Sequence, residues 1–166
     1  MLTKGNVNFM VNNGMMDITA HTLDAAHAYK VVKFKNILRD INRGVEESEK
    51  SFHKELAIDD AFINRINELI KLESEGTINK KDKEELAKLR DTDKRFGEMR
   101  NAMLDEEANL SDVKIMPYEE WKKLQDENKD KKLYYRNRKG EITDTRELLM
   151  VFENELEGVL WKAPEE

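Results

Sequence analysis

The chain of 166 residues contains 39% charged and 39% hydrophobic residues, no cysteine and a formal net charge of -6. A chain of this length can bury one hydrophobic core without the support of disulfide bonds or a structural metal ion. The lack of cysteine excludes a disulfide framework, a thiolate nucleophile and a zinc–thiolate site. The many charges favour long solvent-facing helices over a compact α/β enzyme, and the negative charge argues against a general nucleic-acid binder, whose affinity depends on neutralising phosphates.

Residues 1–21 have the least regular pattern in the chain. Apolar residues alternate over residues 7–11 and precede Asn-Asn-Gly at residues 12–14, which suits a strand and a tight turn. The methionines that follow suit a short helix equally well, and we favour helix or irregular structure. Because Met10, Met15 and Met16 lie outside the clean helical stripes, they are candidates for an adaptable partner-binding surface, although methionine more commonly fills a core.

A long helix is predicted from Thr22, its N-cap, to about Leu56. Its later apolar residues recur at steps of three and four and define one face. At 1.5 Å per residue this helix would be about 50 Å long. Gly44 is its weakest point, where a break or kink is most expected.

Two further helices are predicted before residue 108. Asp59 or Asp60 caps the first of them, and Gly76 closes it as a left-handed residue. Asn79, with Asp82 three residues later, resembles a capping box that opens the second. These breaks favour packing within one chain over an extended coiled coil, so residues 1–108 are predicted to form a helical hairpin or bundle.

The pattern changes after residue 108. Residues 113–116 suit a short strand, and Pro117 suits the first position of a helix. Residues 133–136 and 141–143 flank a turn and indicate a β-hairpin. The predicted fold class is therefore mainly α, with residues 1–108 as a helical body and residues 109–166 as a small α+β segment packed on it, and the two are predicted to form one domain. That segment is predicted to hold a short hairpin or a three-stranded sheet.

A final amphipathic helix completes the predicted segment. Asp144 with Glu147 resembles a second capping box at its start. Apolar residues from Leu148 to Leu160 then form the clearest amphipathic face in the chain, which ends before Pro164.

Basic residues gather between Lys129 and Lys139, where six of them accompany one acid, giving +5 locally and -11 elsewhere. Aromatic faces between cations can stack bases, but an acidic protein partner is favoured over nucleic acid in so acidic a chain. Simple solvation is the more common explanation of such a stretch, and lysine and arginine can also protect an exposed edge strand. The candidate partner-binding residues here are Lys132, Tyr134, Tyr135, Arg136 and Arg138.

The sequence shows no strong catalytic motif. It has no glycine-rich phosphate loop, serine elbow or Cys-His pair. His21, Asp24 and His27 stand three residues apart and could form part of a metal site, but a stable site needs further ligands. Carboxylate runs on helices are usually solvated faces. We therefore predict no catalytic residue, no metal and no cofactor.

The opening residues 2–5 (LTKG), residues 26–33 (AHAYKVVK) before a long charged helix, and the closing helix over residues 148–160 form one layout. This layout resembles that of a family of small phage- and prophage-encoded proteins of unknown function. The resemblance implies an N-terminal helical region, a long helix, a short extended segment and a final amphipathic helix. It supplies no catalytic residues.

We therefore predict a non-enzymatic, phage-type accessory protein with a structural or assembly role, acting through protein–protein contacts or self-association. The alternatives are an inhibitor of a host defence enzyme and, from a different class, a Mg²⁺-dependent all-α nucleotide hydrolase. No stretch approaches the ~18 apolar residues that span a bilayer, and the N-terminus lacks a signal-peptide pattern. The expected location is the cytoplasm, that of the host if the chain is phage-encoded, or the virion.

Overall fold

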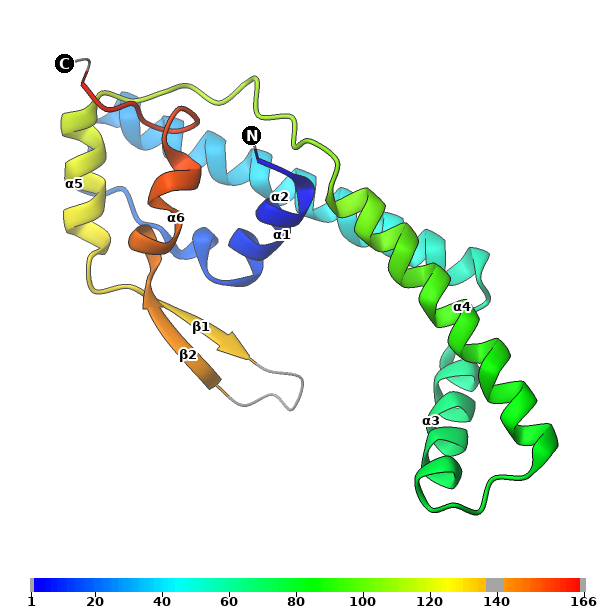
Figure 1. Cartoon of the computed structure of the whole chain (residues 1–166). Helices are drawn as coiled ribbons and strands as arrows, with labels where there is room; N and C mark the ends of the chain where they lie inside the picture. Colours follow the sequence, from blue (N-terminus) through cyan, green and yellow to red (C-terminus); the bar gives the residue numbers. More distant parts are fainter. Residues whose placement is uncertain (1, 137–141, 165–166) are drawn as a thin grey trace. The chain divides into compact units, whose positions relative to one another are not determined.

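The computed structural model describes residues 2–136 and 142–164, except for the side chains of residues 133–136, 142–147 and 151–152. This part of the chain is mainly α-helical, which confirms the predicted class (Figure 1). None of its helices is long and apolar enough to cross a membrane. In chain order, the elements are α1 (Lys4–Asn12), the 3₁₀ turn η1 (Met15–Asp17), α2 (Ala25–Glu55), α3 (Asp60–Ser74), α4 (Lys80–Leu104), α5 (Tyr118–Asn128), β1 (Lys132–Arg136), β2 (Ile142–Glu147) and α6 (Leu148–Leu156).

The chain forms two compact units. Unit 1 comprises Met1–Arg43 and Glu106–Glu166, and unit 2 comprises Gly44–Asp105. This grouping differs from the division at residues 108 and 109 that the sequence suggested. The first part of the chain joins the C-terminal segment in unit 1, because both supply side chains to one hydrophobic core.

The main hydrophobic core lies in unit 1 and draws on α1, the first half of α2, α5 and α6. Trp121 is fully buried and stacks on Trp161, with ring centroids 5.1 Å apart and an interplanar angle of 6°. Tyr118 extends this aromatic group, with its ring 5.7 Å from that of Trp161. Aromatic side chains of this size bury ~150–250 Å² each, so this group is a principal source of stability for unit 1.

The N-terminal residues form helix α1, as favoured over a strand. Thr3 caps the helix in a reciprocal capping box with Asn6, which satisfies two backbone donors at the helix start. The Asn-Asn-Gly stretch ends the helix instead of making a hairpin turn. Gly14 has a φ of 101°, a left-handed conformation that glycine adopts without steric cost.

The start of α2 differs from the prediction. Asp24 caps the helix, since its Oδ1 accepts a 2.9 Å hydrogen bond from the His27 backbone N–H. Thr22 was wrongly expected in this role. Its backbone N–H and hydroxyl instead donate to the Glu127 carboxylate of α5. Of the break or kink allowed for at Gly44, the break is not found, since α2 runs from Ala25 to Glu55 as one helix.

Unit 2 contains the second half of α2 with α3 and α4. The predicted boundaries of the two later helices are confirmed: the Asp59 carboxylate caps α3, Gly76 follows it with a φ of 71°, and the Asn79 side chain caps α4. Arg65 joins α3 to α4 by donating to both carboxylate oxygens of Glu85, at 2.9 and 2.7 Å. The same guanidinium also binds Glu68 and Asp82.

Replacement of Arg65 by lysine should lower the melting temperature of unit 2, because an ammonium cannot reproduce the planar, bidentate contact. The hydrogen bond from Arg65 lowers the pKa of Glu85, so this stabilisation is present above pH ~4.5 and is lost as the pH falls through the folded-state pKa. Thermal unfolding followed by circular dichroism at pH 7 and pH 3 tests this. Lys94→Gln, at an exposed pair with Glu98, should have almost no effect at either pH. If the melting temperatures of the wild type and the Arg65→Lys variant differ as much at pH 3 as at pH 7, the prediction is contradicted.

The C-terminal segment departs from the prediction in three respects. Residues 113–116 form no strand with β1 and β2, and only Met116 makes a bridge, to Trp161. The capping box of Asp144 and Glu147 is wrong, since both residues lie in β2. Helix α6 ends at Leu156, where a turn with Gly158 at a φ of 76° begins. The strands β1 and β2 pair antiparallel, and their connection lies outside the described residues.

Candidate functional site

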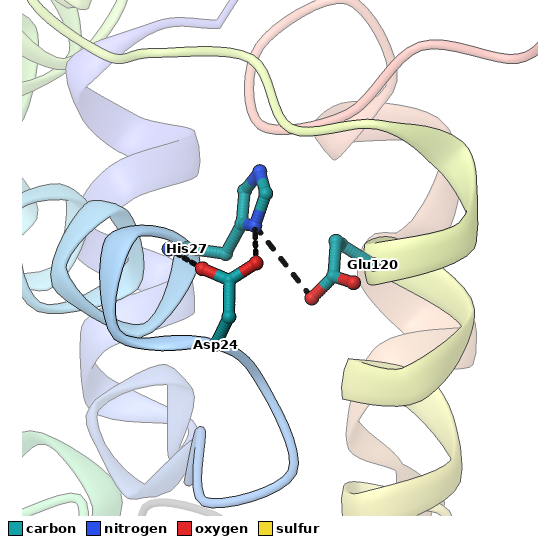
Figure 2. Close-up of side chains that lie close together, drawn as sticks. All are labelled: Asp24, His27 and Glu120. Carbon is teal, nitrogen blue, oxygen red and sulfur yellow. Dashed lines mark hydrogen bonds and ion pairs between the residues drawn. The ribbon is translucent and has the colours of Figure 1, made fainter.

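Three polar side chains of unit 1 converge where the first turn of α2 meets the first turn of α5 (Figure 2). The His27 Nδ1 atom lies 2.7 Å from Asp24 Oδ2 and 3.7 Å from Glu120 Oε2. The ligand atoms of the three residues all lie within 4.8 Å of one another. We call Asp24, His27 and Glu120 the α2–α5 cluster.

Burial differs across the α2–α5 cluster. Asp24 is exposed, His27 is half-buried, and Glu120 is only 8% exposed. One Glu120 oxygen, Oε1, lies 2.5 Å from the Lys123 ammonium. The other, Oε2, is shielded from solvent and accepts no hydrogen bond from the described residues. A buried carboxylate oxygen without a donor costs free energy, so this atom requires an explanation.

Hydrogen bonds in and beside the cluster shift the pKa values of two charged groups. The His27 backbone N–H, and then its imidazole, lower the pKa of Asp24 by hydrogen bonding to its carboxylate. The hydrogen bond to Glu120 raises the pKa of Lys123. An imidazole between two carboxylates can hold a proton or coordinate a cation.

The end of α5 anchors the segment that leads into the cluster. The buried Asn128 side chain accepts hydrogen bonds from the Thr19 backbone N–H and hydroxyl, and donates to the carbonyl oxygens of Thr19 and Leu124. Glu127 accepts from the backbone N–H groups of His21 and Thr22. Burial opposes ionisation of Glu127, but these donors outweigh it and lower its pKa. The segment before Asp24 is therefore held from two adjacent side chains.

A second feature of unit 1 is an apolar pocket of about 310 Å³ between the first half of α2 and residues 113–114. Apolar side chains and three lysines line it together. We call it the lysine-rimmed pocket, and its lining residues are Ala26, Tyr29, Lys30, Lys33, Phe34, Val113 and Lys114.

The predicted methionine surface is corrected by the structure. Met10 and Met15 are 1% and 0% exposed and belong to the unit 1 core, while Met16 is half-buried. Met10 and Met15 looked irregular because α1 and η1 each contribute separately to the same core. Core filling, the commoner role of methionine, therefore accounts for Met10 and Met15.

Of the five candidate residues in the predicted basic surface, only Lys132 has a described side chain. Lys132 is exposed and, with Lys131, lines a cavity of about 390 Å³ that residues 12–14 and Asp17 also line. The structure thus brings the N-terminal region and the start of the basic stretch together. Tyr134, Tyr135 and Arg136 lie in β1 without described side chains, and Arg138 lies outside the described residues.

Glu120 is the residue of the cluster that sequence reasoning missed. It looked like an ordinary acid in the first turn of a helix, a favourable position beside the helix dipole. Nothing local indicated that α5 packs beside the start of α2. The lysine-rimmed pocket had a partial signal, because most of its α2 residues lie in the 26–33 stretch of the resemblance.

Comparisons with family models, with curated proteins and with solved structures give no match, so the functional argument rests on the chain's own geometry.

Proposed function

We propose that this chain is a non-enzymatic accessory protein, of phage type, that acts by binding another protein through unit 1, with a small α+β segment following the helices. The observation that supports this proposal is the lysine-rimmed pocket. Apolar side chains and lysines, with no acidic residue, line the same pocket, a combination suited to anchoring a side chain and selecting its charged neighbours.

The surroundings of the pocket strengthen this proposal. Tyr29 in the pocket lining is 68% exposed, Val32, three residues along α2, is 52% exposed, and Ile115, which follows Lys114 in the chain, is 46% exposed. Exposed apolar residues that gather in one place commonly mark binding surfaces, and tyrosine is frequent among residues that dominate binding energy.

The rim indicates the partner's charge. Lys30 donates to the Ile115 carbonyl oxygen, whereas Lys33 and Lys114 make no ion pair or hydrogen bond within the described residues. Two unneutralised ammonium groups stand out in a chain of net charge -6. The fitting partner is an acidic segment carrying one aromatic or aliphatic side chain, which would fill the pocket while its carboxylates meet the lysines.

This arrangement serves an assembly role or an inhibitory role equally, since both require a stable contact and no chemistry. We retain the assembly role as the leading proposal and inhibition of a host defence enzyme as the alternative. Both roles require that an acidic protein surface binds at α2, and this binding can be tested directly.

Fluorescence anisotropy with a labelled nine-residue peptide, rich in Asp and Glu around a central Phe, provides the test. We expect saturable binding that weakens with salt. The Lys33→Glu, Lys114→Glu double variant should weaken binding at least about tenfold, and so should Tyr29→Ala. A peptide with Gly in place of Phe should also bind less tightly.

Lys132→Glu is the matched control, because it reverses one charge on the other candidate surface. Binding that survives the double variant but not Lys132→Glu would move the partner site to the basic stretch. Absence of saturable binding by the wild-type chain would overturn the proposed partner chemistry.

A further inference from the structure

We infer that the α2–α5 cluster is a divalent transition-metal site, with Zn²⁺ as its fitting ion. The donors would be Asp24 Oδ2, His27 Nδ1 and Glu120 Oε2. This site is separate from the lysine-rimmed pocket and does not rest on the proposed function. The sequence offered His21, Asp24 and His27 as part of a metal set that lacked further ligands. The fold brings Asp24 and His27 together with Glu120 of α5, and His21 is not part of this group.

The orphaned oxygen of Glu120 is the independent observation that points to a ligand. A structural role accounts for Asp24 and His27, because Asp24 caps α2 and receives the imidazole hydrogen bond. It leaves Glu120 Oε2 without a donor. Nδ1 carries at most one hydrogen, which is directed to Asp24 Oδ2 at 2.7 Å, so it does not serve Glu120 at 3.7 Å.

The geometry of the donors suits a small ion. Zinc bonds to nitrogen and oxygen are ~2.0–2.2 Å long, and in a tetrahedron they place the donor atoms ~3.3–3.6 Å apart. The two distances from His27 Nδ1, 2.7 and 3.7 Å, lie on either side of that separation. The three atoms lie within 4.8 Å of one another, so side-chain rotation would have to draw them in around one ion, which would take the place of the proton between Asp24 and His27.

The chemistry of the donors selects the class of ion. One imidazole with two carboxylates suits zinc and its neighbours, whereas Mg²⁺ and Ca²⁺ prefer oxygen ligands alone. Lys123 holds Glu120 Oε1, which leaves Oε2 as a single donor. Asp24 lies at the exposed side, so a water molecule can complete the coordination there, as in open sites with three protein ligands.

Titration of the tag-free, full-length chain with Zn²⁺ against a chromophoric chelator tests the site. We expect one ion per chain, and a visible absorption band of low-symmetry coordination when Co²⁺ is used instead. His27→Gln and Glu120→Gln should each weaken Zn²⁺ binding at least about tenfold. His21→Gln and Glu119→Gln, which change the same residue types nearby, should leave it unchanged.

Circular dichroism and tryptophan fluorescence of the metal-free variants show whether each remains folded. Where Glu120→Gln loses structure, His27→Gln decides the outcome alone. Equal Zn²⁺ binding by the wild type and a folded His27→Gln variant would overturn the inference, as would absence of stoichiometric binding by the wild type. Peptide binding at the lysine-rimmed pocket should persist in His27→Gln, which separates the two proposals.

Discussion

Replacement of Trp121 by alanine should lower the free energy of unfolding by about 3–5 kcal/mol, the usual cost of removing a large buried aromatic side chain. Trp121 is fully buried and stacks on Trp161, so the variant loses the transfer free energy of one ring and leaves a cavity against the other. Urea unfolding followed by far-ultraviolet circular dichroism measures the change, since the substitution itself removes one of the two tryptophans and alters the fluorescence signal.

The Trp121→Phe variant keeps an aromatic ring at this position but removes the indole N–H group. Neither Trp121 Nε1 nor Trp161 Nε1 has a hydrogen-bond partner within the described residues. Phenylalanine removes one of these unpaired donors along with some volume, so its cost should be well below that of alanine. Met150→Ala, at an α6 residue that is 67% exposed, should be almost neutral. A Trp121→Ala effect under about 1 kcal/mol would contradict a core organised around the stacked pair.

Helix ends were predictable where the chemistry is local. The Asp59 and Asn79 side chains cap the helices that follow them, and Gly76 takes the left-handed conformation expected after α3. Each of these outcomes depends on a side chain and the backbone within three or four residues. Such geometry is encoded in a short window, so pattern reasoning identifies it.

The sequence could not predict the structure where neighbouring residues suit the same role equally well, or where a segment suits a strand but needs a partner. Thr22 and Asp24 are both suitable N-caps, and the outcome depends on Glu127, which binds the Thr22 backbone N–H and hydroxyl. Residues 113–116 have a strand-like composition, but Met116 donates its backbone N–H to the Leu160 carbonyl oxygen instead of joining β1 and β2. Distant partners decided both cases.

The candidate sites depend on such distant contacts throughout. The α2–α5 cluster requires Glu120 beside His27, and the lysine-rimmed pocket requires Lys114 beside Lys33. No spacing rule relates α2 to residues far along the chain. The sequence indicated the Asp24 and His27 half of the cluster through their three-residue step, and packing supplied the other half.

Replacement of Asn128 by alanine should destabilise unit 1 by about 2–4 kcal/mol, because it leaves buried partners of a neutral amide without hydrogen bonds. Asn128 is 0% exposed, and its side chain binds three groups of Thr19 and the Leu124 carbonyl oxygen. Urea unfolding monitored by tryptophan fluorescence is suitable, since both tryptophans lie in unit 1. Asn154→Ala, at an exposed position of α6, is the matched control and should change stability little.

The Asn128 variant also tests how the cluster is held. Asn128 and Glu127 together anchor residues 19–22, the segment that delivers Asp24 to His27 and Glu120. Amide hydrogen exchange of residues 19–24 should therefore increase in Asn128→Ala under native conditions, while exchange in α3 and α4 stays at the wild-type rate. Unchanged protection of residues 19–24 would show that Glu127 alone secures the segment. Faster exchange there, with weaker Zn²⁺ binding, would identify the end of α5 as the element that positions the carboxylate of Asp24.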